Sequence, residues 1–136
     1  MGGGEADNGG IRIVRLGSPR HAGEGLRIGT VRHPPRGVPR AEHAKRNFYD
    51  VWLPGLAPSR ELVKAGLSAS DERAWARFAK RYRGEMKATE ASHLLDLLAA
   101  LSHLTSFSVG CYCAAEDRCH RSVLRAILAE KGARFA

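Results

Sequence analysis

The chain has 136 residues, which suits one compact domain, and its 43% hydrophobic content supports a single core and excludes disorder throughout. Its formal net charge of +8, carried mostly by arginine, favours an anionic partner, although a GC-rich genome that favours arginine and alanine codons accounts for the charge equally well. The odd number of cysteines argues against a secreted disulfide framework, and no apolar run has membrane-spanning length, so we expect a cytoplasmic protein without membrane contact.

The N-terminal half predicts strands. We expect Met1–Gly10, which is rich in glycine, to be a disordered tail, and residues 11–136 to form a single α/β domain. Three segments have the alternating or β-branched pattern of strands: Ile11–Leu16, Leu26–Arg32 and Phe48–Leu53. The second of these ends before Pro34-Pro35, because proline cannot continue a strand ladder.

The C-terminal half alternates helices with one strand. Helical spacing or capping residues predict helices at 60–65, 70–83, 90–104 and 119–131, and an apolar run predicts a strand at 107–114. In the second helix, Trp75, Phe78, Ala79 and Tyr82 form one face, which we interpret as core rather than ligand-stacking. Strands separated by helices indicate a small, mainly parallel sheet flanked by helices, in a three-layer Rossmann-like fold.

The segment Arg32–Arg40, RHPPRGVPR, is a basic loop stiffened by proline. Between Ile11 and Arg46 the chain has nine basic and two acidic residues, a net charge of +7 by subtraction, so most of the charge lies in about a quarter of the sequence. We expect Arg32 and Arg36 to point at a common anion. A solvated basic face is the alternative.

The stretch 107–125, FSVGCYCAAEDRCHRSVLR, contains all three cysteines together with a histidine and three arginines. A strand–loop–helix unit directs the N-terminus of the helix, near Cys119, towards the loop, and that end attracts anions. We therefore predict an anion site formed by Arg118, Cys119 and Arg121, completed by Arg32 and Arg36.

Two better-known chemistries fit this stretch poorly. A phosphatase-like loop needs an arginine six positions after its cysteine, but that position is Asp117 counted from Cys111 and Cys119 counted from Cys113. The three cysteines and His120 could supply four zinc ligands, but a Cys-x-Cys pair on a strand is a poor chelate. We expect no metal and no other cofactor.

Covalent chemistry would depend on Cys113 and His120. Cys113 is predicted at the carboxyl end of a strand, where ligands bind in open α/β sheets, and a nearby helix N-terminus would favour its thiolate. Cys113 would be the nucleophile and His120 the acid or base. The alternative is that the cysteines are buried small hydrophobes, which we favour most strongly for Cys111.

The C-terminal stretch resembles the domain-of-unknown-function 488 (DUF488) family through Cys113 and the triplet Cys119-His120-Arg121. The middle of the chain is similar to the YeaO-like branch of that family at Pro35-Arg36-Gly37-Val38, Trp52-Leu53, Leu56-Ala57-Pro58-Ser59, Trp75, Phe78, Tyr82 and Glu85. The resemblance covers roughly residues 26–132. It implies a compact Rossmann-like domain and supplies no established activity. Many members have Asp-Val-Arg after the early strand, whereas this chain has Thr30-Val31-Arg32.

Three functional hypotheses remain open at this point. The first is a phosphate-recognising domain that binds or acts on a nucleotide or nucleic acid. The second is a basic nucleic-acid-binding protein without catalysis, and the third is a structural or interaction protein with no catalytic site. The sequence sets neither a substrate nor an oligomeric state.

Overall fold

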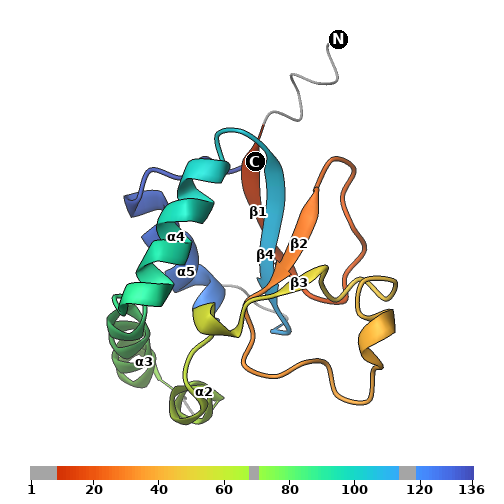
Figure 1. Ribbon diagram of the computed structural model, residues 1–136. Coiled ribbons are helices and arrows are strands. Elements are labelled where there is room, and N and C mark those ends of the chain that lie inside the picture. The colour runs from red at the N-terminus through yellow and green to blue at the C-terminus, as the bar shows by residue number, and fades with distance from the viewer. Residues whose placement is uncertain (1–8, 68–70, 114–118) are drawn as a thin grey trace.

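A parallel sheet forms the centre of the computed structural model, which describes residues 9–67, 71–113 and 119–136 (Figure 1). In the described part of the chain the strands are β1 (Gly10–Arg15), β2 (Leu26–Gly29), β3 (Val51–Trp52) and β4 (Ser106–Cys111). They lie in the order β1-β4-β2-β3, and every neighbouring pair is parallel. The expected small α/β Rossmann-like domain with a parallel sheet is confirmed.

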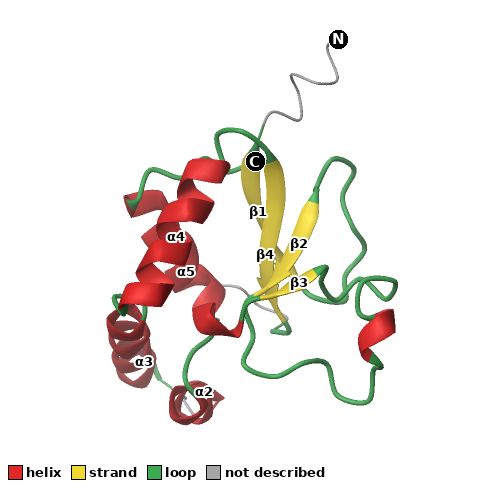
Figure 2. Ribbon diagram, viewed as in Figure 1, coloured by secondary structure: helices red, strands yellow, loops and turns green. Residues whose placement is uncertain are grey.

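The helices stand together on one side of this sheet (Figure 2). They are α2 (Arg60–Leu67), α3 (Glu72–Glu85), α4 (Thr89–Leu101) and α5 (His120–Glu130), and two short 3-10 turns lie at Arg40–Glu42 (η1) and Pro54–Leu56 (η2). The predicted cap of α2 is confirmed, because the Ser59 hydroxyl accepts a hydrogen bond from the Leu62 N–H at 3.3 Å. No helix among the described residues is both long and apolar enough to cross a bilayer.

The main core lies between the sheet and these helices. Ile11, Ile28, Phe107 and Val109 from the strands pack with the leucines of α4 and α5. On α3, Phe78 and Tyr82 are buried, and Trp75 and Ala79 pack against them, which confirms the predicted face of that helix.

Loops cover the opposite side of the sheet. Arg27 and Ser108, which alternate with the core-facing Ile28 and Val109, are fully buried there. The Arg27 guanidinium binds Glu24 and reaches backbone carbonyls of the loops that follow β1 and precede β3. The third layer therefore consists of loops around a buried ion pair, with only η1 as a short helix.

Two strands end earlier than predicted, at points where side-chain contacts take the place of backbone hydrogen bonds between strands. β4 ends at Cys111 rather than at residue 114, because the following Tyr112 carbonyl accepts from the Arg15 side chain and its hydroxyl donates to the His33 carbonyl. β2 ends at Gly29, against which the Tyr49 ring packs so closely that a Cβ there would clash.

β3 is limited to two residues, much shorter than the predicted 48–53. At the other end of the sheet, Gly10 already belongs to β1, and its N–H donates to the Ser102 carbonyl at 2.7 Å, so the strand begins one residue earlier than predicted. Gly9, also placed in the predicted tail, is buried, and residues 1–8 lie outside the described residues.

Candidate active site at the carboxyl edge of the sheet

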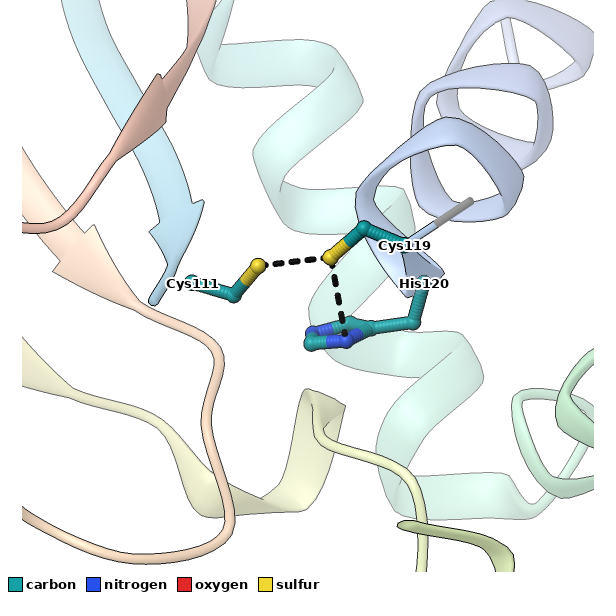
Figure 3. Close-up of side chains that lie close together, drawn as sticks. All are labelled: Cys111, Cys119 and His120. Atoms are coloured by element: carbon teal, nitrogen blue, oxygen red, sulfur yellow. Dashed lines mark hydrogen bonds between the residues drawn. The ribbon is translucent and has the colours of Figure 1, made fainter. Parts of the chain in front are cut away.

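Three segments meet at the carboxyl edge of the central strands. β4 ends at Cys111, Thr30 directly follows β2, and α5 begins at His120. Figure 3 shows the Cys111 side chain directed from the end of β4 towards Cys119 and His120 at the start of α5. Ligands of open parallel sheets bind at this edge, so the site stretch lies where such a fold positions chemistry.

The three thiols gather at this point and have different environments. Cys111 and Cys119 are buried with their sulfur atoms 2.6 Å apart, whereas Cys113 is exposed. Hydrogen bonds from the Cys111 and Cys119 thiols lower the pKa of Cys113, and the nearby charge of Arg121 adds to that effect. The pKa of Cys111 is raised by the same contacts and by burial, so Cys111 stays protonated as a donor. These contacts therefore favour the ionised form at Cys113 rather than at the two buried thiols.

His120 is buried and held in one tautomer. Its Nε2 lies 2.7 Å from the Thr30 carbonyl oxygen, which can only accept, so Nε2 is the protonated nitrogen. The other nitrogen, Nδ1, faces the Cys119 sulfur at 3.8 Å. Burial lowers the pKa of His120 to about 4, which leaves the ring neutral near pH 7. The sulfur that contacts the predicted acid or base is thus that of Cys119 rather than that of Cys113.

Arg121 binds the backbone of the exposed cysteine. Its side chain is only 3% exposed, and its Nη2 donates to the Cys113 carbonyl at 2.7 Å. Its Nε is buried and has no hydrogen-bond partner among the described residues. An arginine nitrogen without a partner is costly to bury, so the position suits an incoming acceptor such as a phosphate oxygen.

The other predicted arginines are placed differently. Arg32 borders the site, where its Nε and Nη2 donate to the Pro58 and Ala57 carbonyls, each at 3.1 Å. Arg36 is exposed and does not line the same cleft. Arg118 lies outside the described residues. The structure therefore brings Arg32, Cys113, Cys119 and His120 to one cleft, with Arg121 bound to the Cys113 carbonyl.

We call this cleft the thiol cleft. It has a volume of about 320 Å³, and its walls include Arg32, Trp75, Phe78, Tyr112, His120 and all three cysteines. Trp75 and Phe78 stack on each other with ring centroids 4.9 Å apart. The sequence predicted these two rings as core, which is correct for packing, but it missed that they also form a wall of the cleft. This second role depends on how α2 packs on α3, where Gly66 lies against the Phe78 ring, and that is a tertiary contact rather than a local sequence pattern.

A metal ion would find three ligand groups here, because one atom each of Cys111, Cys119 and His120 lie within 4.8 Å of one another. The sequence argument against a metal placed Cys113 on a strand, and that premise is wrong because β4 ends at Cys111. The absence of a metal therefore stays a prediction, and Cys111, Cys119 and His120 are the described groups that would hold an ion.

Fold and site together define a small Rossmann-like α/β domain with a cysteine cluster at the carboxyl edge of its sheet. A family model described as the active DUF488-N3 subclade matches residues 11–132. The chain therefore belongs to the DUF488 family, as its motifs indicated. The search of curated proteins and the search of solved structures found no match.

The departure of this chain from the family pattern falls inside the site. Thr30, where many relatives have aspartate, is fully buried, and its hydroxyl donates to the Gly110 carbonyl at 3.1 Å. The same oxygen lies 3.5 Å from His120 Nε2. An aspartate at this position would therefore face the histidine ring, whereas threonine offers it no charge.

Proposed function

We propose that this protein binds a nucleotide unit, free or within a nucleic acid, in the thiol cleft and uses Cys113 as a nucleophile on it. The observation that carries the proposal is the position of Cys113: an exposed thiol at an apolar, aromatic cleft, in contact with a buried arginine. Neither DNA nor RNA is favoured by these contacts.

The walls of the cleft support a ligand with a flat apolar part and an anionic part. Trp75, Phe78 and Tyr112 offer ring surfaces on which a base can stack. Arg32 in the wall supplies positive charge. Arg121 is not part of the wall, but it binds the Cys113 carbonyl and adds a second positive charge, and its Nε is a donor without a partner among the described residues. A phosphate ion alone would use the arginines and leave the aromatic wall unexplained.

Cys113 is the best nucleophile of the three cysteines because it alone is exposed. The buried thiols donate to its sulfur much as an oxyanion hole donates to oxygen, and they keep it ionised. Its sulfur would form a bond to an electrophilic centre of the ligand while the bond to the leaving group breaks. His120 would act through Cys119, whose sulfur it contacts, and so position the cluster rather than touch the ligand.

Alkylation with iodoacetamide tests this proposal. At about pH 6, well below the ordinary thiol pKa of about 8.5, we expect mass mapping to find rapid labelling of Cys113 and slow labelling of Cys111 and Cys119. A saturating nucleotide should protect Cys113. A Cys113→Ser variant is the control for site assignment. Labelling of Cys113 no faster than that of a free cysteine, and unaffected by any nucleotide, would contradict the proposal.

A further inference from the structure

A second cleft opens on the other side of the Arg32–Arg40 loop, with a volume of about 720 Å³. We call it the proline-loop cleft. Its lining includes Pro34, Pro35, Arg40, His43, Tyr49 and Trp52. None of these residues belongs to the thiol cleft, and the function proposed above uses none of them.

Tyr49 gives this cleft a polar group without a protein partner. The side chain is 5% exposed and packs edge-on against His43, with ring centroids 5.2 Å apart. Its hydroxyl is buried and has no hydrogen-bond partner among the described residues. Burial raises the pKa of Tyr49, so the hydroxyl keeps its proton and can donate. Folding leaves this donor for a group that enters the cleft.

Trp52 gives the same cleft a fixed aromatic surface. The indole is 39% exposed, unusual for a tryptophan outside a binding surface, and its Nε1 donates to the Val31 carbonyl at 2.7 Å. That bond holds the ring in place, so stacking on it costs little conformational entropy. Asp50 also lines the cleft, but Arg20 binds its carboxylate at 2.8 and 3.0 Å and cancels its charge.

Successive residues of one segment line the two clefts. Val31, Arg32 and His33 line the thiol cleft, and the next two residues, Pro34-Pro35, line the proline-loop cleft. Arg36 and Arg40 are exposed along the same loop. The molecule thus presents two aromatic hollows that adjoin one basic segment, and this segment belongs to residues 11–46, which have a net charge of +7. A strand with bases in both hollows would place its phosphates on the arginines between them.

We propose that the proline-loop cleft is a second base-binding subsite, so that the ligand of this protein is a single-stranded nucleic acid rather than a free nucleotide. This inference rests on the function proposed for the thiol cleft and extends it. An acidic peptide would match the charge, but it would leave Trp52 and the Tyr49 hydroxyl without a matching group.

The chain contains two tryptophans, one in each cleft, and this makes the inference testable. In a Trp75→Phe variant the fluorescence reports on Trp52, and in a Trp52→Phe variant it reports on Trp75. We expect a thymidylate oligonucleotide of about eight residues to quench both variants. Thymidine monophosphate should quench Trp75 at a concentration at least about tenfold higher than the oligonucleotide, because it lacks the linked second subsite.

Each outcome separates the two proposals. If the oligonucleotide quenches Trp75 but leaves Trp52 unchanged, the second subsite is wrong and the thiol cleft stands. If it quenches Trp52 but not Trp75, the proposed function of the thiol cleft is wrong while the second cleft stands. Quenching of neither overturns both. Quenching of Trp52 by polyglutamate as strongly as by the oligonucleotide would replace the nucleic acid by an acidic peptide.

An Arg40→Ala variant, with Arg77→Ala on the exposed face of α3 as the matched control, checks the charge requirement. Both arginines are exposed, so both variants should fold. We expect Arg40→Ala to weaken oligonucleotide binding several-fold and to lower the slope of log affinity against log salt by about 0.7, the value for one phosphate contact on a single strand. Arg77→Ala should change neither. Equal effects of the two substitutions would show that the oligonucleotide binds through general surface charge, and this would overturn the proposal of a second base-binding subsite.

Discussion

Two buried arginines have opposite surroundings in this protein. Arg27, on the loop-covered side of the sheet, is 0% exposed and directs hydrogen bonds to both carboxylate oxygens of Glu24 and to the carbonyls of Ser18, Pro19 and Asn47. Arg121, at the start of α5, is as deeply buried but has an Nε with no partner among the described residues. A satisfied network of this kind stabilises a fold, whereas an unsatisfied one is typical of a site that awaits a ligand.

The largest effect should come from breaking the satisfied pair. We expect Arg27→Met to lower the free energy of unfolding by about 3–5 kcal/mol, because it leaves the Glu24 carboxylate buried without its partner. Urea unfolding followed by circular dichroism measures this. A loss below about 1 kcal/mol would show that water reaches Glu24 and that the pair is not the centre of the loop layer.

The pH dependence separates the two regions. Burial lowers the pKa of His120 to about 4 from 6.5, so the unfolded chain binds the proton more tightly. The free energy of unfolding should therefore fall by about 1.4 kcal/mol per pH unit as the pH drops from 6.5 to 4. Urea unfolding of the protein and of His120→Gln, which has no titrating ring, measures the difference. An equal slope in the two proteins would show that His120 is not the group responsible.

The pKa of Glu24 is lower than that of His120. Burial alone would raise its pKa, but hydrogen bonds from Arg27 and Ser108 hold that pKa at about 2, below the ordinary 4.5. Its contribution to stability is complete above pH 4.5 and is lost as the pH falls towards 2. The loop layer should therefore keep its ion pair at pH values where the thiol site is already destabilised.

Arg121→Met is the counterpart of Arg27→Met and should behave in the opposite way. We expect it to lower the free energy of unfolding by at most about 1 kcal/mol, since it removes one hydrogen bond and also an unpartnered buried nitrogen. Nucleotide protection of Cys113 against alkylation should be lost. A destabilisation as large as that of Arg27→Met, with protection intact, would make Arg121 a structural residue.

The smallest effect concerns the other unsatisfied group, the Tyr49 hydroxyl. Tyr49→Phe removes a buried oxygen without a partner, so we expect the free energy of unfolding to rise by up to about 1 kcal/mol. Oligonucleotide affinity, measured by the quenching of Trp52, should fall several-fold in the same variant. Loss of stability on this substitution would reveal a protein partner for the hydroxyl and remove the argument for a ligand.

The sequence predicted most elements correctly because their signals are local. The apolar period of β1, the aromatic face of α3 and the Ser59 cap depend on residues within one or two turns of each other. The ends of β2 and β4 could not be predicted, since they depend on contacts with Tyr49 and Arg15 that come from other segments. The burial of Arg27 could not be predicted for the same reason. Its partner, the Glu24 carboxylate, also accepts a hydrogen bond from Ser108, which is 84 residues away from Glu24 in the chain.

The sequence predicted which residue types gather at the candidate site, but it did not predict which of these residues contact each other. The clustering of cysteine, histidine and arginine in 107–125 predicted a site at the carboxyl edge of the sheet, and the cysteines and His120 do lie at that edge. Spacing could not show that His120 would contact Cys119, that Arg121 would bind the Cys113 carbonyl, or that Arg32 would bind backbone carbonyls. Those pairings depend on how α5 packs against the end of β4, which is a tertiary arrangement without a local signature.

A crystal structure of the Cys113→Ser protein soaked with thymidine monophosphate tests the central claim most directly. The account predicts the base against Trp75 in the thiol cleft and a phosphate oxygen within hydrogen-bond distance of the Arg121 Nε. A structure in which that nitrogen is bonded to another group of the protein, and the thiol cleft stays empty of nucleotide, would contradict it.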